Sequence, residues 1–264
     1  MPTANNSIAD NRGIKRKSMK SKLTVLVTAL ILCFNANAQD TKMLTIDSLV
    51  VFGKEALQIN DTIKAIAYFT ESSEQGSEKA QFELGNLYIL KGEYETARHW
   101  LNKAGEQGNL RALNNIGLSY AREGKYDDAK KWYLKSAEKG DPVAQKNLGI
   151  IYQFGQGVEQ DYEEAMKWYK LSVEQNYAMA ESNLAEMYLK GEGVSENFSE
   201  AFRLFTLSAN QGFWMGEYGL AYMYENGFGT EKNIEEAIKW YKAAQSHGHE
   251  GATEALKKLE EDRK

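Results

Sequence analysis

One alanine recurs along this chain at almost constant spacing and in the same local context. It stands at Ala65, Ala97, Ala129, Ala165, Ala201 and Ala237. The successive units are therefore 32, 32, 36, 36 and 36 residues long. Periods of this length are typical of arrays in which each unit is a pair of helices that packs only against its neighbours. The period predicts an all-α repeat array rather than a domain with one central core.

The chemistry of a single unit predicts two helices. After the alanine of the third unit, aromatic residues follow at the third and fourth positions and a small residue at the seventh, which together make one helix face that Gly140 can end. Asp141 and Pro142 are typical of the start of a second helix. Asp161, with Glu164 three residues later, forms a capping box for the next unit. The same box recurs as Asn197 with Glu200 and as Asn233 with Glu236.

A small residue recurs in the middle of the second of these helices in each unit. It is Gly85, Gly117, Gly149, Ala185 or Ala221, and a tyrosine follows three residues later. Glycine inside a helix costs about 1 kcal/mol relative to alanine, so a close approach of neighbouring helices is predicted at these positions. The glycine pairs that begin at Gly155, Gly191 and Gly227 superficially resemble phosphate-binding loops. None follows a strand or carries a P-loop lysine, so they are interpreted as turns, and the second glycine of the first pair, Gly157, is expected in an open loop.

These residues resemble a known repeat. The pattern A-x-x-W-Y-x-x-[SA]-x-x-x-G-x-x-x-A-x-x-x-L-G-x-x-Y-x-x-G-x-G-V is similar to the Sel1-like repeat, a relative of the tetratricopeptide repeat, over about residues 45 to 264. The units around Gly92 and Gly124 lack the G-x-G-V loop and look closer to ordinary tetratricopeptide repeats. The resemblance implies a right-handed α-solenoid of six antiparallel helix pairs, followed by a C-terminal capping helix, that is used for protein interaction.

The N-terminal residues are typical of an export signal. Six basic residues precede the apolar run from Leu23 to Phe34, and Ala36-Asn37-Ala38 provides small residues for cleavage after Ala38. Residues 1–38 are thus expected to be a signal peptide, with Met19 as the true start, and residues 39–264 the repeat domain. At twelve residues the run is shorter than the roughly 20 needed to span a bilayer. The mature chain is expected in the periplasm or outside the cell, with no membrane span.

Composition narrows the classes of partner. The formal net charge is −5, and removal of residues 1–38 would take away six basic residues and one acidic residue. Such an acidic chain does not suit nucleic acid or anionic lipid. Cys33, the single cysteine, lies in the removed segment after Leu32, where a lipoprotein signal would have a small residue. Lipidation is therefore not favoured, and no disulfide is expected in the mature chain.

Few residues suggest chemistry. His247 and His249 lack a third metal ligand at a credible spacing, and no nucleophile, base and orienting group can be assembled. The tryptophans at the third position after the repeating alanine are expected in the core between helices. Phe213 and Trp214 replace cap-type residues at the start of one helix. Burial in the core is favoured for this pair, and an exposed aromatic anchor is the alternative.

The sequence therefore favours a non-catalytic binding scaffold without cofactor or metal, which takes a protein or peptide in the groove lined by the helices that carry the small mid-helix residue. Two alternatives stay open: an enzyme that binds or hydrolyses β-lactams, as in the cysteine-rich Sel1-like proteins, and a tether that binds cell-envelope glycan. The chain lacks those cysteines and an S-x-x-K site. By resemblance, the groove positions are Phe82, Asn86, Ile89, Asn114, Leu118, Arg122, Lys146, Ile150, Phe154, Ser182, Glu186, Lys190, Tyr218 and Glu225.

Overall fold

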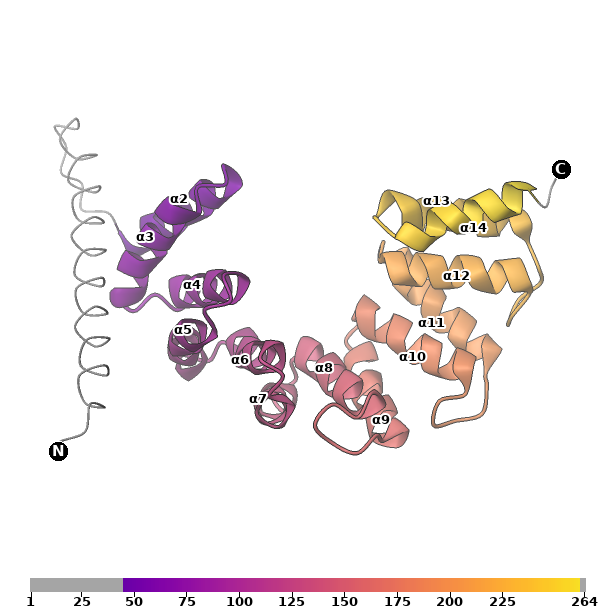
Figure 1. Cartoon of the computed structure of the whole chain (residues 1–264), viewed down its shortest axis with the longest axis horizontal. Helices are drawn as coiled ribbons and strands as arrows, with labels where there is room; N and C mark the ends of the chain where they lie inside the picture. The colour runs from indigo at the N-terminus through magenta and orange to yellow at the C-terminus, as the bar shows by residue number, and fades with distance from the viewer. Residues whose placement is uncertain (1–44, 262–264) are drawn as a thin grey trace, which may run out of the picture. The chain divides into compact units, whose positions relative to one another are not determined.

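The computed structural model describes residues 45–261, which form thirteen helices and no strand (Figure 1). The helices are α2 (Ile46–Gln58), α3 (Thr62–Glu74), α4 (Glu78–Leu90), α5 (Tyr94–Glu106), α6 (Leu110–Arg122), α7 (Tyr126–Ala137), α8 (Pro142–Gln153), α9 (Tyr162–Val173), α10 (Ala178–Lys190), α11 (Phe198–Asn210), α12 (Trp214–Asn226), α13 (Ile234–Ser246) and α14 (Glu250–Glu261). The expected signal peptide lies outside the described residues. None of the helices described is long and apolar enough to cross a membrane.

The even-numbered helices from α2 to α12 are the first members of six pairs and are called A helices here, and the odd-numbered helices that follow them are called B helices. Helices of one pair pack against each other, and most B helices also pack against the A helix of the next pair. The predicted all-α array of six antiparallel pairs followed by a terminal helix is confirmed. The chain divides into two compact units, residues 1–80 and 81–264, and the boundary falls in the first turn of α4.

Polar side chains set the start of several helices. Asp61 accepts a hydrogen bond from the backbone N–H of Lys64, and Asp161 accepts one from the backbone N–H of Glu164, as the sequence predicts for Asp161. Asn197 and Asn233 repeat the second bond. The expected capping boxes are only half formed, because the backbone N–H of each cap residue donates to a tyrosine carbonyl oxygen of the preceding A helix. Each glutamate at the third position pairs with a basic residue one turn further along instead. These ion pairs are Glu164 with Lys167, Glu200 with Arg203, and Glu236 with Lys239.

The core lies between the helices and is built from the same repeat positions in every unit. The repeating alanine is fully buried at all six places. A β-carbon built on Gly149 would lie 2.4 Å from Cε1 of Tyr169, the aromatic residue four places after the repeating alanine in the adjacent B helix. One built on Gly117 would lie 2.6 Å from Tyr133. The predicted close approach at the small residue is therefore confirmed, and its partner is mainly a ring.

The small residue at the seventh position after the repeating alanine is a serine in most B helices, and its hydrogen bond explains why it is small. The hydroxyl of Ser136 donates to the backbone oxygen of Leu110 in the first turn of the preceding A helix, at 2.8 Å. Ser72, Ser172 and Ser208 donate to Ile46, Pro142 and Ala178 in the same way. Only a short side chain can lie there and still reach that oxygen. The repeat position thus joins the two helices by one hydrogen bond in four of the six pairs, and Ala104 and Ala244 occupy it in the other two.

The second glycine of each G-x-G loop is packed, and the expectation of an open loop at Gly157 is wrong. A β-carbon there would lie 2.7 Å from Cβ of Tyr126, the first residue of α7. β-carbons built on Gly193 and Gly229 would lie at least as close to Tyr162 and Phe198, the first residues of α9 and α11. The loop therefore lies against the start of the previous B helix. The positive φ of these glycines, +67° at Gly157, suits the same residue type.

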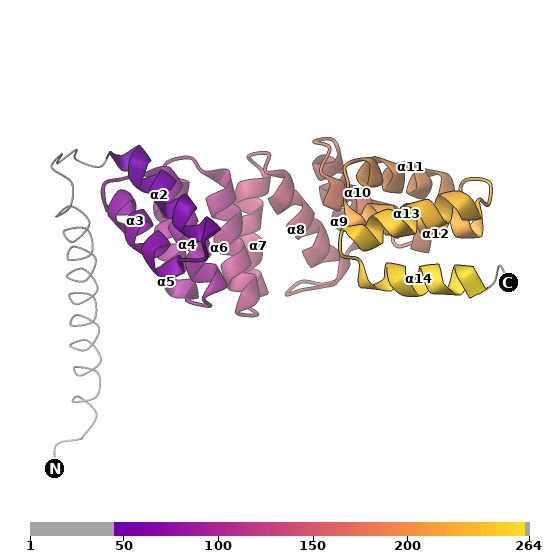
Figure 2. The same cartoon turned by 90° about the horizontal axis from the view of Figure 1, so that it is seen from above.

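The C-terminal helix closes the array as expected. Ala252, Leu256 and Leu259 of α14 are buried against Tyr241 and its neighbours, while Lys257 and Lys258 are exposed. Figure 2 shows α14 lying alongside α13. An end helix with one polar face covers apolar surface that would otherwise face solvent.

Candidate functional site: the A-helix face

The A helices of residues 81–261 form one layer of the array. In Figure 1, α6 and α8 lie on one side of their pairs, and α7 and α9 lie on the other. The A helices α6 and α8 contact each other directly, as do α10 and α12. Each of these two contacts joins the outward side chains of two A helices into one surface, and the outward side chains of all the A helices of residues 81–261 are called the A-helix face here. The predicted groove residues lie on these helices.

A row of side-chain amides crosses this face from α8 to α4. Asn147 donates to Oδ1 of Asn114 at 2.9 Å, Asn114 donates to Asn115 at 2.9 Å, and Asn115 donates to Asn86 at 2.7 Å. Lys146 begins the row by donating to Oδ1 of Asn147 at 2.7 Å. These five residues are called the amide row here. Each amide is oriented by its neighbour, so the row holds its remaining donors and acceptors in fixed positions.

Lys146 is the most unusual residue of the row. It is 9% exposed, and none of the ion pairs among the described residues involves it. Burial lowers the pKa of its ammonium group from the usual value of 10.5, because the charged form loses hydration. A buried ammonium with a single amide acceptor is a costly arrangement. Such a group is a candidate for binding an anionic group from outside the chain.

A second feature of the face is an aromatic hollow between α10, α12 and the start of α14. It has a volume of about 700 Å³, and Trp214, Tyr218, Tyr222, Phe198, Phe228 and His249 line it together with Glu186, Lys190 and Glu196. The Tyr218 ring stacks on His249 with centroids 4.0 Å apart, and Phe198 stacks on Phe228 at 4.7 Å. These contacts fix the walls of the hollow.

Trp214 is 38% exposed and Tyr222 is 38% exposed, so both rings are partly open to solvent. Trp214 begins α12, and its predecessor Phe213 makes no side-chain cap. The two residues contact each other at 5.6 Å between ring centroids. Trp214 thus follows the less favoured of the two sequence interpretations, an aromatic side chain at the surface rather than in the core.

The other tryptophans differ from Trp214, and they contact the core between helices, as expected, from its edge. Trp132, Trp168 and Trp240 are half-buried, each packs on one side against the core, and the ammonium of a lysine lies over the ring. In these three units the buried ring is the next residue, Tyr133, Tyr169 or Tyr241.

The remaining predicted groove residues fall into three groups. The first group contains apolar side chains of the A-helix face that are half-buried and pack against the core: Phe82, Ile89 and Ile150. Arg122 is exposed, Leu118 is half-buried, and Phe154 is 64% exposed at the end of α8. Ser182 is 1% exposed and shares a hydrogen bond with Ser208, so it was wrongly expected to face outward.

The structure brings several predicted residues together and leaves others apart. Asn86, Asn114 and Lys146 belong to the amide row, although Asn114, at 4% exposed, is more buried than expected. Glu186, Lys190 and Tyr218 meet in the aromatic hollow, where Glu186 accepts a hydrogen bond from Lys190. Glu225 lies outside both groups and accepts a hydrogen bond from the Tyr241 hydroxyl at 2.6 Å.

Two members of the amide row were missed by the sequence analysis, Asn115 and Asn147. The signal was present, because an asparagine stands two residues before the small residue in three successive A helices, at Asn115, Asn147 and Asn183. Asn183 does not extend the row, since its side chain lies against the hydroxyl of Tyr169.

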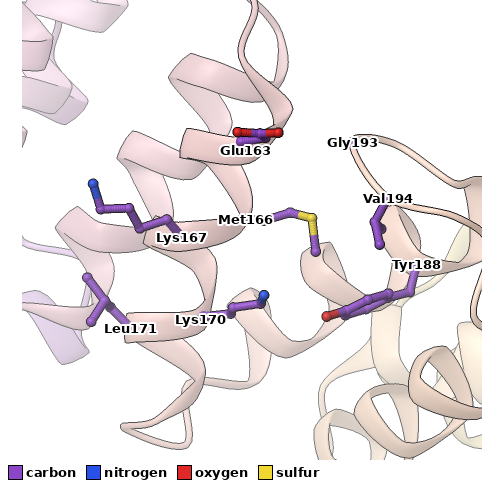
Figure 3. Close-up of a pocket in the computed structure, with 8 residues that line it drawn as sticks. All are labelled: Glu163, Met166, Lys167, Lys170, Leu171, Tyr188, Gly193 and Val194. Atoms are coloured by element: carbon purple, nitrogen blue, oxygen red, sulfur yellow. The ribbon is translucent and has the colours of Figure 1, made fainter.

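A shallower hollow lies between the B helix α9 and the end of α10 with the loop that follows it (Figure 3). Figure 3 shows the Met166 side chain pointing toward Tyr188 and Val194. Lys167 at its edge is paired with Glu164. The hollow has a volume of about 480 Å³ and is formed by a G-x-G-V loop, which recurs along the chain, and it contains no nucleophile next to a base.

The two histidines near the C-terminus have structural contacts. The Nδ1 atom of His247 lies 2.8 Å from the buried carboxylate of Glu217, where other units pair a glutamine with Gln145 or Glu181. His249 packs on Tyr218. Within residues 45–261, no three His, Cys, Asp or Glu side chains are grouped so that they could hold a metal ion.

Comparison with known proteins agrees with this architecture. The Sel1 repeat matches residues 52–77, 78–109, 142–177, 178–213 and 214–249, and a tetratricopeptide repeat matches residues 110–138. The tetratricopeptide match covers the unit around Gly124, as expected from its missing loop, whereas the unit around Gly92 matches the Sel1 repeat. No curated protein matches the chain.

Solved structures share the fold. A protective antigen present in uropathogenic Escherichia coli strains is 29% identical with a TM-score of 0.59, and the match covers 81% of this chain and 48% of that protein. A Sel1 repeat protein from Oxalobacter formigenes is 26% identical with a TM-score of 0.64, over 79% and 86% of the two chains. Yeast Tom70, 16% identical with a TM-score of 0.63 over 92% and 60%, shares the fold alone. The repeats matched span more than half of the sequence, and the chain belongs to the Sel1 repeat family.

Proposed function

We propose that this protein is an exported, non-catalytic scaffold whose A-helix face binds an extended segment of a partner protein. The family supports the coarser part of this proposal, because repeats of helix pairs commonly serve protein interaction. The position of the binding surface and the kind of segment bound are our inference from the amide row.

The amide row is the observation that carries the proposal. An extended peptide offers alternating N–H and C=O groups and needs partners for both. Asparagine amides provide a donor and an acceptor in one side chain, and the row places four of them across α4, α6 and α8. Because the row orients each amide before binding, a peptide would lose little affinity to ordering of the protein.

Lys146 would add charge selectivity to this surface. Its ammonium has one acceptor, the Asn147 amide, and so has donors left for a second group. A carboxylate of the partner would offset the cost of burying the ammonium, and the charge-assisted bonds would be stronger than those between neutral groups. Phe154, which is 64% exposed at the end of the same helix, offers an apolar contact about two turns further along. Together they favour a segment with an acidic and an apolar residue.

A photo-crosslinking experiment would test the surface. The photoreactive phenylalanine analogue benzoylphenylalanine would replace Phe154 on the A-helix face or, as a control, Lys131, whose side chain is 72% exposed on the B helix α7. In cell-envelope material, we expect adducts of defined mass from position 154, and we expect Asn114→Ala with Lys146→Ala to remove them. Adducts formed only from position 131 would place the binding surface on the B helices and contradict the proposal.

The exported location rests on residues 1–38, which precede the described part of the chain. Their basic residues and apolar run support cleavage after Ala38. The intact mass of protein recovered from the periplasm or the medium would test it: we expect a chain that begins at Gln39. A mass that retains the apolar run would mean an uncleaved segment.

A further inference from the structure

We infer that the aromatic hollow between α10 and α12 binds a cationic side chain, preferably arginine, from the same partner segment. This inference rests on the proposed function, because it adds a second contact on the A-helix face. The argument comes from the tryptophans, from the carboxylates of the hollow and from the shape of its walls.

The tryptophans of this chain normally carry a cation of their own. A lysine ammonium lies 4.6 Å from the ring centroid of Trp100 and 4.8 Å from that of Trp132, and the corresponding distances at Trp168 and Trp240 are 5.9 Å and 5.4 Å. A cation over an indole face is attracted by the ring quadrupole. Trp214 is the exception: in the part of the chain that the structure describes, no lysine or arginine lies over it. A ligand could therefore supply the cation that Trp214 lacks.

The charges of the hollow are complementary to a cation. Glu186 and Glu196 line it, against a single basic residue, Lys190. Lys190 is already paired with Glu186. Glu196 is exposed and forms no ion pair within residues 45–261, so one carboxylate remains for a bound cation. The burial of His249 lowers the pKa of its imidazole, which keeps the hollow free of a second positive charge near neutral pH.

The walls suit a flat group. The ring pairs Tyr218 with His249 and Phe198 with Phe228 are stacked within 16° of parallel, and they hold the sides of the hollow rigid. The rings of Trp214 and Tyr222 are each 38% exposed and remain open for contact. A guanidinium group is planar, stacks on aromatic faces and donates two parallel hydrogen bonds to a carboxylate. A lysine ammonium matches only the charge, so arginine fits the combination better.

Nuclear magnetic resonance of the ¹⁵N-labelled protein provides a direct test. The chain has five tryptophans and therefore five indole N–H signals, and the Trp214 signal is identified by its loss in Trp214→Phe. The probes are N-acetyl-arginine methylamide and N-acetyl-citrulline methylamide, which has nearly the same shape without the charge. We expect a saturable shift of the Trp214 signal with the arginine probe and affinity about tenfold weaker with citrulline.

Matched variants locate the charge. Glu196→Gln should weaken arginine binding several-fold, whereas Glu231→Gln, in the corresponding loop of the next unit and outside the hollow, should leave it unchanged. Equal affinity for the two probes, no shift of the Trp214 signal, or an effect of Glu231→Gln as large as that of Glu196→Gln would overturn the inference. A Trp214 shift with a tetramer of N-acetylglucosamine but not with arginine would assign the hollow to glycan instead.

The outcome separates this inference from the proposed function. Asn147 belongs to the amide row and does not line the hollow, so the two surfaces can be tested separately. If the crosslinking experiment fails while the arginine probe still binds, the proposed surface around the amide row is wrong and the hollow stands. If crosslinks form normally and the arginine probe does not bind, only the inference about the hollow is wrong.

Discussion

Individual residues on the A-helix face show a conflict between stability and binding. Lys146 occupies a position that is serine in α10 and asparagine in α6, and both of those side chains are neutral. At 9% exposed, its ammonium loses hydration without gaining a carboxylate. A residue that costs folding free energy at a site with unused hydrogen-bond donors is better explained by function than by packing.

Lys146→Met should therefore raise the melting temperature, by about 2–4 °C for each 1 kcal/mol recovered. The direction in which this gain changes with pH follows from the lowered pKa of Lys146. Below its pKa in the folded protein the ammonium is charged and destabilises the fold; as the pH rises through that pKa toward 10.5, the lysine loses its proton and the cost disappears. The gain from Lys146→Met should then be present at pH 7 and shrink with increasing pH.

Lys139→Met, at an exposed position of the preceding turn, serves as the control and should change the melting temperature little at any pH. Thermal unfolding followed by circular dichroism from pH 7 to 10 measures both variants. A lower melting temperature for Lys146→Met throughout this range would show that Lys146 stabilises the fold, and the argument for a functional lysine would fail.

At the scale of the helix pair, the G-x-G loop determines how one unit follows the next. Gly157 packs against Tyr126 at the start of α7, and the equivalent contacts recur at Gly193 and Gly229. The units around Gly92 and Gly124 have no such loop, and a β-carbon at either glycine would meet nothing within 4 Å. The four extra residues of the longer units thus add a contact between units as well as a turn.

Gly157→Ala should destabilise the protein more than Gly124→Ala. Both glycines have positive φ, +67° and +74°, so both variants carry the left-handed strain of about 1–2 kcal/mol. Only the first also places a methyl group 2.7 Å from Cβ of Tyr126, and such overpacking typically costs about 1–3 kcal/mol more. Melting temperatures of the two variants provide the measurement, and equal losses would mean that the loop yields freely.

Features that repeat within one pair were predictable from the sequence, and features that depend on neighbouring pairs were not. The buried alanines, the glycine at each ring contact and the cap at Asp161 all follow from local pattern. The amide row depends on the register between α6 and α8, which brings Asn147 to Asn114 from 33 residues away. The openness of Trp214 likewise depends on how α10, α12 and His249 are arranged around it, which single-helix periodicity does not reveal.

For the whole molecule, the repeat architecture makes stability a sum of local terms. Each helix contacts mainly its neighbours in the chain, so the loss of a contact at one end should not spread far. Two buried leucines allow a comparison: Leu256, in the terminal helix α14, and Leu148, in α8 in the middle of the array, are 8% and 1% exposed. Replacement of either by alanine removes apolar contacts and leaves a cavity, at a cost of about 2–5 kcal/mol.

The two variants should differ in where protection is lost. With Leu256→Ala, hydrogen exchange of backbone amides should accelerate in α12 to α14 and stay unchanged in α6 and α7, because within residues 45–261 the main packing partner of α14 is α13. With Leu148→Ala, exchange should accelerate in α7 to α9, on both sides of the cavity, while α13 and α14 keep their protection. Mass spectrometry of peptides from the exchanged protein resolves these regions. Equal acceleration along the whole chain in both variants would show that the array unfolds as one cooperative body, and the additive description of its helix pairs would then be wrong.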